Sequence, residues 1–280
     1  MEKSILTPKE ISETAVNVSV NKANMVWWRQ MLLAVMAGMF IGLAGNGASI
    51  SAYSATSAGM AKMLSGVLFG AGLIMVLIAG AELFTGNSLM IVGVMEKKIT
   101  VLSMLKNWGI VYLGNFIGGA GLAWLINQTT QLNMDHGELG AYAINTALSK
   151  CTLDFKTAFI MGIFCNVLVC IAVWISWAGK DIVSKVMGLY LPIWLFVTSG
   201  YEHCVANMYF VPVGIFAKSN ESYVAAAIEK YGISEAQLAN LSWSDFFVNN
   251  LIPVTLGNIV GGAVCVGLVY WLIYLKKTKE

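Results

Sequence analysis

The sequence predicts an all-α integral membrane protein, and two observations support that prediction. Of its 280 residues, 58% are hydrophobic and only 11% are charged, with a mean hydropathy of +0.71. A soluble domain usually carries about 25% charged residues, so this chain lacks the polar surface that a water-facing globule needs. Apolar runs long enough for six spans of about 20 residues each also follow one another along the chain. This pattern argues against a water-soluble enzyme, a disordered tail protein and a nucleic-acid binder.

The first predicted element is a polar helix that precedes the spans. Thr7 can serve as its N-cap, Pro8 suits the first helical position, and Glu10 completes a capping box. The helix is too polar to cross a membrane, so residues 1–28 are expected to form a cytoplasmic amphipathic segment that ends at interfacial Trp28. It is either a surface anchor or a movable plug over a pore.

A membrane domain is expected over residues 29–275, followed by a basic cytoplasmic tail at 276–280. Its apolar runs occupy residues 30–53, 61–95, 107–127, 157–178, 186–216 and 247–275. The second and fifth runs exceed the length of one regular span and carry polar interruptions at 79–88 and 198–207. Gly, Asn, Ser and Thr at membrane depth are typical of broken helices. We therefore expect the second and fifth helices to break at the midplane.

The basic residues predict the orientation of this bundle. With six spans, most of the 17 Lys and Arg residues fall in the two terminal segments and in the connections after the second and fourth runs. The positive-inside rule then places both termini in the cytoplasm, as an even number of spans requires.

Two pairs of segments match each other in the two halves of the chain. Leu-Gly-Asn-Phe-Ile-Gly-Gly at 113–119 matches Leu-Gly-Asn-Ile-Val-Gly-Gly at 256–262, and the Gly, Glu and Asn spacing of 80–87 recurs at 200–207. If three spans repeat as three, the odd number forces opposite orientations. The prediction is a 3+3 inverted repeat whose broken helices meet near the midplane, where such transporters bind substrate. The glycines would let neighbouring helices pack closely.

His203 is the first candidate for a functional side chain. It lies in the second interruption beside Glu202, and ionisable groups inside a membrane are costly and rare. Histidine has an ordinary pKa of about 6.5, close to neutral, so His203 is suited to give a hydrogen bond or a proton to a solute at the midplane. A buried structural histidine is the alternative. His136, in a polar loop, is expected to be solvated.

Glu82 and Glu202 allow a proton-relay interpretation, but their matching positions favour a shared structural duty at the helix breaks. Each carboxylate can accept hydrogen bonds from backbone N–H groups that the break frees. Asn87 and Asn207, five residues further on in each half, are assigned to the same structural role.

The remaining candidates are neutral donors, a lysine and apolar side chains. Thr85 and Asn166 could orient a small anion or join helices by hydrogen bonds. Lys150 could draw anions to the outer mouth or be an ordinary interface lysine. Apolar side chains flank the breaks and form either core or constrictions: Phe69, Leu73, Leu83, Phe84 and Phe196. The five cysteines contain no Cys-x-x-Cys pair, so neither a metal nor a cofactor is expected.

Several long motifs resemble the formate/nitrite transporter family. They are Gly-Ala-Glu-Leu-Phe-Thr-Gly-Asn (80–87), Lys-Asn-Trp-x-x-x-Tyr-Leu-Gly-Asn (106–115), Cys-Asn-Val-Leu-Val-Cys-Ile-Ala-Val-Trp (165–174), Ser-Gly-Tyr-Glu-His-Cys-Val-Ala-Asn-Met (199–208) and Ile-Pro-Val-Thr-Leu-Gly-Asn (252–258). The resemblance covers residues 9 to 275. It implies a homopentamer of aquaporin-like protomers in the lipid of the bacterial inner membrane. Each protomer would be a passive channel or proton-linked transporter for a small weak-acid anion, not an enzyme.

By position, the resemblance also implies roles for single residues. His203 matches the central pore histidine and Thr85 the threonine of the first broken helix, while Asn166 matches a pore-side asparagine and Lys150 an outer-vestibule lysine. Two hydrophobic slits correspond to Phe69, Leu73, Leu83, Phe84, Val169 and Phe196. The helix at 7–26 matches a segment proposed to gate formate-type members. The Thr-Gly-Asn at 85–87 looks closer to the nitrite and hydrosulfide branches than to the formate branch.

Two rival functions are compatible with a membrane helix bundle. An aquaporin-like channel for neutral small solutes shares the architecture, but neither break contains Asn-Pro-Ala. A haem-binding redox subunit would usually need several intramembrane histidine ligands, and this chain offers His203 alone. Formate, nitrite and hydrosulfide are the candidate anions.

Overall fold

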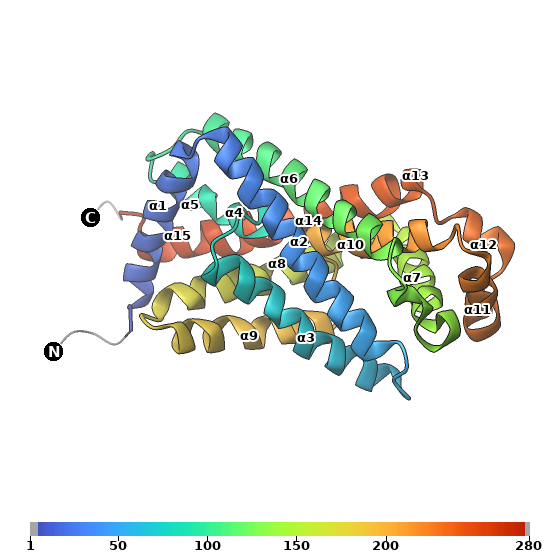
Figure 1. Cartoon of the computed structure of the whole chain (residues 1–280). Coiled ribbons are helices and arrows are strands. Elements are labelled where there is room, and N and C mark those ends of the chain that lie inside the picture. Colours follow the sequence, from blue (N-terminus) through green and yellow to red (C-terminus); the bar gives the residue numbers. More distant parts are fainter. Residues whose placement is uncertain (1–4, 278–280) are drawn as a thin grey trace.

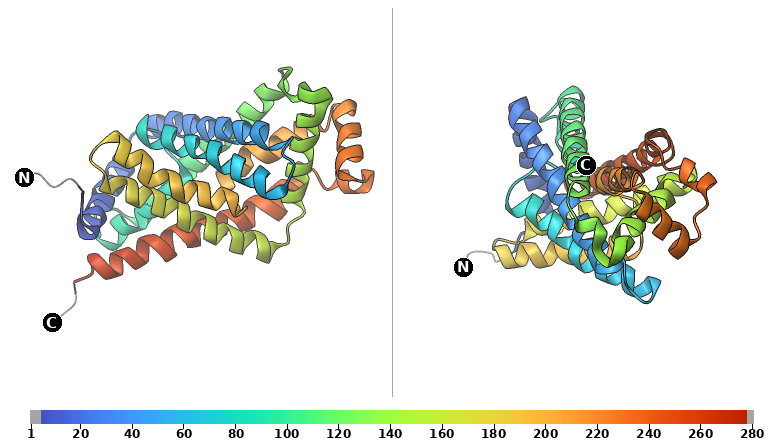
Figure 2. Two further views of the ribbon diagram at one scale, coloured as in Figure 1. Left: turned by 90° about the horizontal axis from the view of Figure 1, so that it is seen from below. Right: turned by 45° about the vertical axis from the view of Figure 1, so that its right-hand side comes forward.

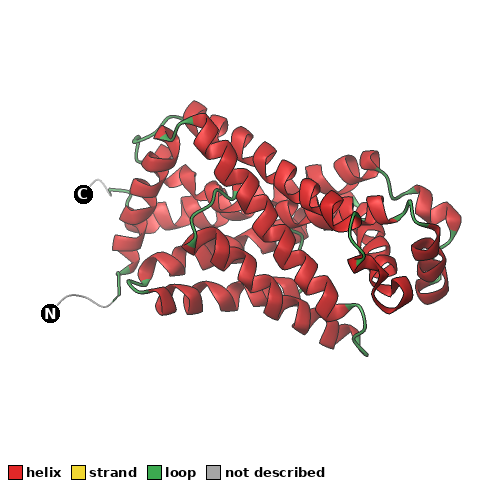
Figure 3. Ribbon diagram, viewed as in Figure 1, coloured by secondary structure: helices red, strands yellow, loops and turns green. Residues whose placement is uncertain are grey.

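The computed structural model describes residues 5–277, which contain helices and no strand (Figures 1 and 3). The first part comprises α1 (Pro8–Asn24), α2 (Trp27–Ala52), α3 (Ala58–Ile78), α4 (Phe84–Asn87), the 3-10 helix η1 (Ser88–Met90), α5 (Ile91–Met95), α6 (Val101–Asn127), the 3-10 helix η2 (Gln131–Asn133) and α7 (Met134–Cys151). The second part comprises α8 (Phe155–Ala178), α9 (Ile182–Thr198), α10 (Cys204–Ala217), α11 (Glu221–Tyr231), α12 (Glu235–Ala239), α13 (Trp243–Asp245), the π-helix η3 (Phe246–Leu251), α14 (Ile252–Ile259), the π-helix η4 (Val260–Leu268) and α15 (Val269–Tyr274). The predicted segments 1–28 and 276–280 lie partly outside the described residues.

Long apolar helices dominate the described chain. Five are long and apolar enough to cross a membrane: Trp27–Ala52, Ala58–Ile78, Val101–Asn127, Phe155–Ala178 and Trp243–Tyr274. Three shorter apolar helices are Phe84–Met95, Ile182–Thr198 and Cys204–Ala217. The second predicted run is thus divided between α3 and α4–α5, and the fifth between α9 and α10. The expectation of an all-helical chain rich in membrane-length helices is confirmed for residues 5–277.

A glycine lies in each of the two interruptions. Gly80 has φ +84° and Gly200 has φ +73°, in the left-handed region that glycine enters without steric cost. Residues 79–83 and 199–203 contain no helix, and a new helix begins directly after each segment, at Phe84 and at Cys204. The chain therefore changes direction twice inside apolar sequence, and each new helix N-terminus lies in the protein interior.

Glycines also bring the long helices into close contact. A Cβ on Gly118 of α6 would lie 2.1 Å from the carbonyl oxygen of Val35 in α2. A Cβ on Gly261 of η4 would lie 2.3 Å from the carbonyl oxygen of Ile163 in α8. Any larger residue would push these pairs apart, because small residues are what allow helix backbones to approach. The predicted close packing of the Gly-Asn-x-x-Gly-Gly motifs is confirmed.

Helix α1 crosses one end of the bundle, where the end of α15 also lies (Figures 1 and 2). Its predicted capping box is present: Thr7 accepts from the Glu10 N–H, and the Glu10 carboxylate accepts from the Thr7 N–H at 2.7 Å. Ile11 and Ala15 are buried against the bundle. Helices α11 and α12 lie at the opposite end (Figure 1). Both ends of the described chain are therefore on the same side of the bundle.

Candidate functional site

The two interruptions meet at a contact between Thr85 and His203. Thr85 Oγ1 lies 3.0 Å from Nε2 of His203, although the residues are 118 positions apart in the chain. Thr85 is fully buried and His203 is 2% exposed. Thr85 belongs to the first turn of α4, and His203 is the N-cap of α10. Two helix N-termini thus converge on one hydrogen-bonded pair.

The backbone of α10 determines which ring nitrogen of His203 carries hydrogen. Nδ1 accepts the N–H of Ala206 at 2.9 Å, as an N-cap side chain does. A nitrogen that accepts has no hydrogen of its own, so the neutral ring carries its hydrogen on Nε2 and donates it to Thr85. An imidazolium would carry hydrogen on both nitrogens and would lose the Ala206 bond. In this conformation, His203 is a neutral donor.

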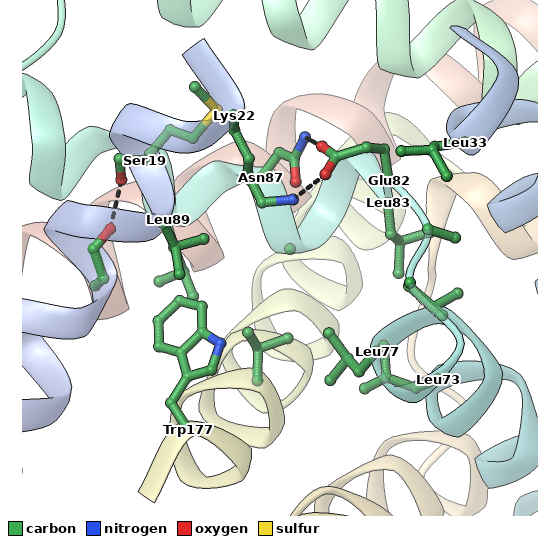
Figure 4. Close-up of a pocket in the computed structure, with 18 of the residues that line it drawn as sticks. Ser19, Lys22, Leu33, Leu73, Leu77, Glu82, Leu83, Asn87, Leu89 and Trp177 are labelled. Carbon is green, nitrogen blue, oxygen red and sulfur yellow. Dashed lines mark hydrogen bonds and ion pairs between the residues drawn. The ribbon is translucent and has the colours of Figure 1, made fainter. Parts of the chain in front are cut away.

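A cavity of about 320 Å³ lies on the α1 side of this pair, and we call it the α1 cavity. Leu73, Leu83 and Gly86 line it together with Lys22, which α1 contributes. Figure 4 shows its polar wall, where Lys22, Glu82 and Asn87 adjoin one another, and its apolar side with Leu73, Leu77 and Trp177. The cavity is therefore mainly apolar, with one ion pair in its wall.

A second cavity of about 360 Å³, the α7 cavity, is lined by His203 itself. Phe69, Phe196 and Phe210 form aromatic walls, and Lys150 of α7 contributes a charged group. The rings of Phe69 and Phe196 meet edge to face at 5.7 Å, and Phe196 stacks on the His203 ring at 5.9 Å. The histidine thus lines this cavity and stacks against one of its aromatic walls.

Asn166 binds the backbone of Thr85. Its side-chain Nδ2 lies 3.2 Å from the Thr85 carbonyl oxygen, 3.3 Å from Ser88 Oγ and 2.6 Å from the Asn258 carbonyl oxygen. Asn166 is fully buried and lines neither cavity. Its contacts therefore favour the helix-joining role over direct contact with a solute.

Glu202 is buried at 4% exposure and fully paired. Its carboxylate accepts from Lys150 at 2.8 Å, from Asn207 at 2.6 Å and from Asn250 at 3.1 Å. Asn207 also donates to Asn250 at 2.7 Å. The ion pair neutralises Lys150, whose side chain is 16% exposed. Lys150 lines the α7 cavity as part of a neutral pair and not as a free cation.

Glu82 has a similar but smaller set of partners around the other break. Its carboxylate accepts from Lys22 at 2.5 Å and from Asn87 at 2.7 Å. Asn87 also donates to Asn107 at 2.8 Å. Glu82 is 5% exposed, so it too is a buried carboxylate with a lysine and an asparagine. The lysine, however, comes from α1 and not from the membrane bundle.

Two further asparagines clamp the backbone of the breaks. Asn258 accepts from the Cys204 N–H at 2.9 Å and donates to the Glu202 carbonyl at 3.0 Å. It therefore holds the peptide groups on both sides of His203. Asn115 accepts from the Phe84 N–H at 2.9 Å and donates to the Glu82 carbonyl at 2.9 Å.

The remaining predicted constriction residues separate into two groups. Leu73 and Leu83 line the α1 cavity, as Phe69 and Phe196 line the α7 cavity. Phe84 instead packs edge to face on Tyr112, with ring centroids 4.9 Å apart, and Phe84 and Val169 line neither of these cavities. No group of three or more His, Cys, Asp and Glu within residues 5–277 could hold a metal ion.

Sequence reasoning missed several members of these networks. Asn107 and Asn250 were available from the repeat, because they are separated by the same 143 residues as Asn115 and Asn258. The sequence predicted Asn115 and Asn258 only as parts of a helix-packing motif. Lys22 had no such signal, since it lies in a polar helix outside the repeated segments.

Comparison with known proteins agrees with this architecture. The family model for the formate/nitrite transporter matches residues 9–272. The chain is 40% identical to the formate channel FocA of Haemophilus influenzae, over 98% of this chain and 95% of that protein. It is 36% identical to the formate channel FocA of Escherichia coli K12, over 98% of this chain and 96% of that protein.

A solved pentameric formate channel with formate bound has a similar fold. It is 42% identical, superposes with a TM-score of 0.79, and the match covers 89% of this chain and 98% of that one. These relatives are channels, so this chain is an integral membrane transport protein and not an enzyme. With the family model matching nearly its whole length, the chain belongs to the formate/nitrite transporter family.

Proposed function

We propose that the chain conducts a small monovalent weak-acid anion, formate first, with nitrite and hydrosulfide as the other candidates. The observation that carries this proposal is the buried Thr85–His203 pair, which lies between two cavities with largely apolar walls. The names of the relatives support formate, since the proteins that are 40% and 36% identical to this chain are formate channels.

The physical problem is to move a charge past apolar walls. A bare charge at the bilayer centre costs several kcal/mol or more, so an anion needs donors when it leaves water. The Nε2–H of His203 is such a donor, and Thr85 Oγ1 is beside it. A passive channel needs only these hydrogen bonds. A proton-linked mode needs His203 to become cationic first, which requires the Ala206 bond to break.

We also propose the 3+3 inverted repeat with helices broken at the midplane. Its support is the matched hydrogen bonding. Each break has a glycine, a buried glutamate, an asparagine five residues later, and two asparagines from the third long helix of its half. The match extends to the first helices, because Asn115 donates to the Ala34 carbonyl as Asn258 donates to the Gly162 carbonyl.

A homopentamer in the bacterial inner membrane, with cytoplasmic termini, completes the proposal. The pentameric state of the solved formate channel supports the assembly, and the proximity of both described chain ends supports a common side for the termini. Helix α1 would act as a lid, since it contributes Lys22 and Ser19 to the α1 cavity. Native mass measurement should give five times the 30.2 kDa protomer mass.

The test is formate uptake into proteoliposomes over a range of pH. His203→Phe removes the donor and the N-cap together and should reduce flux by at least about tenfold, which corresponds to one lost hydrogen bond of about 1.4 kcal/mol in the barrier. His203→Asn keeps a capping side chain and separates stability from transport. His136→Asn, at an exposed, non-helical position near the start of α7 with φ +57°, is the matched control and should leave flux unchanged.

Unchanged formate flux with an unchanged pH profile in His203→Phe would refute the role of the histidine. Stopped-flow measurement of water and glycerol permeation addresses the aquaporin-like alternative. Rapid neutral-solute flux together with no anion flux in the wild type would refute the proposed substrate class.

A further inference from the structure

We propose that Lys62 is the residue that recruits the anion at the mouth of the α7 cavity. This inference rests on the proposed function and goes beyond it, because it assigns the attraction of the anion to a side chain outside the histidine site. Three observations support it: the neutralisation of Lys150, the position of Lys62, and the charge balance of the two cavities.

Lys150 is not available for this task. Its Nζ lies 2.8 Å from a carboxylate oxygen of buried Glu202, and its backbone carbonyl accepts from Asn250 at 3.2 Å. Moving Lys150 toward an anion would leave Glu202 as a buried charge held only by asparagines, and breaking such a pair is costly. The pair therefore contributes little net charge to the cavity.

Lys62 lines the same cavity and is exposed. It lies in the second turn of α3, and its ammonium group lies against Gly200, where an added Cβ would be 3.0 Å from Nζ. No ion pair joins Lys62 to an acidic side chain within residues 5–277. Lys62 is thus an unneutralised cation beside the break that contains His203.

Gly200 makes this position possible. Its missing side chain leaves room above the break, and the ammonium of Lys62 occupies that room. At Gly80, the corresponding position of the other break, an added Cβ would meet nothing within 4 Å. The cation is therefore a feature of one break and not of both.

The two cavities also differ in the net charge of the side chains that line them. The α1 cavity is lined by Lys22 and Glu82, which pair with each other. The α7 cavity is lined by the Lys150–Glu202 pair and by Lys62. One cavity is therefore balanced and the other carries one net positive charge. A cleft of one sign with low-dielectric walls raises the local concentration of oppositely charged solutes.

The experiment measures formate uptake at concentrations well below saturation in proteoliposomes held at zero membrane potential with valinomycin and equal potassium. Lys62→Gln should lower the initial rate about threefold at about 10 mM ionic strength, and Lys62→Glu about tenfold, because a unit charge several ångströms from the path acts through a high dielectric. Lys62→Arg should retain the rate. All differences should shrink to less than about twofold at about 500 mM potassium gluconate, where charges are screened within a few ångströms.

Lys156→Glu is the matched control. It makes the same change of charge at an exposed position of the first turn of α8, and Lys156 lines neither cavity. Its uptake should match that of the wild type. Equal rates for wild type and Lys62→Glu at low ionic strength would overturn the inference, as would a loss that salt does not reduce. Failure of the wild type to conduct formate would instead contradict the proposed function, so the two failures are distinguishable.

Discussion

The two helix breaks use one hydrogen-bonding scaffold and differ in what they place on it. In each, a buried glutamate pairs with a lysine and an asparagine, and a second asparagine clamps the peptide groups around the following residue. That residue is Leu83 in one break and His203 in the other. The scaffold keeps irregular backbone stable inside apolar surroundings, while the side chain it holds is free to differ.

The lysines differ in origin. Lys150 belongs to α7, which is part of the packed bundle, whereas Lys22 belongs to α1, which lies across one end. Both ammonium groups neutralise a carboxylate that is about 5% exposed. The comparison suggests that one network is permanent and the other depends on whether α1 is docked.

The largest expected effect is the loss of stability when Lys150 is replaced, compared with the smaller loss when Lys22 is replaced. Lys150→Met leaves Glu202 buried without its cation and should lower the free energy of unfolding by about 3–5 kcal/mol. Lys22→Met should cost less, because α1 can shift and admit water to Glu82. Thermal unfolding in detergent measures both. Glu202→Gln added to Lys150→Met should recover much of the loss, and no recovery would mean that the ion pair is not the cause.

The clamping asparagines should have the next largest effect. Asn258→Leu and Asn115→Leu each leave buried backbone groups unpaired, at a cost of about 1–3 kcal/mol per group in the free energy of unfolding. Only Asn258 holds the peptides beside His203, so its loss should also reduce formate flux more than the loss of Asn115 does. Equal flux for the two variants at matched folded fractions would show that the clamps do not position the histidine.

Alanine at the break glycines should have a smaller effect. Each substitution forces a side chain into the left-handed region, at about 1–2 kcal/mol of stability. Gly200→Ala should also displace the Lys62 ammonium, since its Cβ would lie 3.0 Å from Nζ, whereas Gly80→Ala meets no atom within 4 Å. Chemical denaturation and formate uptake together distinguish the two. Similar flux losses in both variants would argue against a role for Lys62.

The smallest effect concerns the exposed helix caps. Asp154 caps α8 and Asp181 caps α9; hydrogen bonds from Thr157 and Ser184 hold the pKa of each carboxyl below its ordinary value of 3.8. A lowered pKa means that the stabilisation is complete above the unfolded-state pKa and is lost as pH falls through the folded-state pKa. Asp154→Ala should therefore destabilise the protein at neutral pH, and the loss should shrink as pH falls below the ordinary carboxyl pKa of 3.8 and through the lowered folded-state pKa. A pH-independent loss would contradict this linkage.

Much of the fold could be predicted from local patterns. Hydropathy alone located every long apolar helix of the described chain, although Val101–Asn127 begins six residues before the predicted run at 107–127, and the Thr7 capping box located the start of α1. Both interruptions were visible as polar residues inside apolar runs. These features are local, because a helix start or a break depends on neighbours a few positions away.

The candidate site was predictable only in part. Thr85 and His203 were both named from sequence, and their motifs pointed to a common site, but their contact joins residues 118 apart. That Asn166 supports Thr85 from behind, and that Phe84 packs on Tyr112 away from the cavities, depends on which faces of packed helices meet. Side-chain direction across helices is set by tertiary packing and not by sequence spacing.

The sequence by itself determined the helices, the two breaks and the position of one glutamate in each break. The reason is that the apolar pattern of a helix and the turn that a glycine allows depend on neighbours only a few residues away. Only the tertiary structure decided which charged side chains pair with each other. It paired Lys22 with Glu82 across 60 residues and Lys150 with Glu202 across 52, and it left Lys62 without an acidic partner among residues 5–277. The physical reason is that the cost of a buried charge is offset only by a specific partner within a few ångströms, and folding decides which lysine reaches that distance.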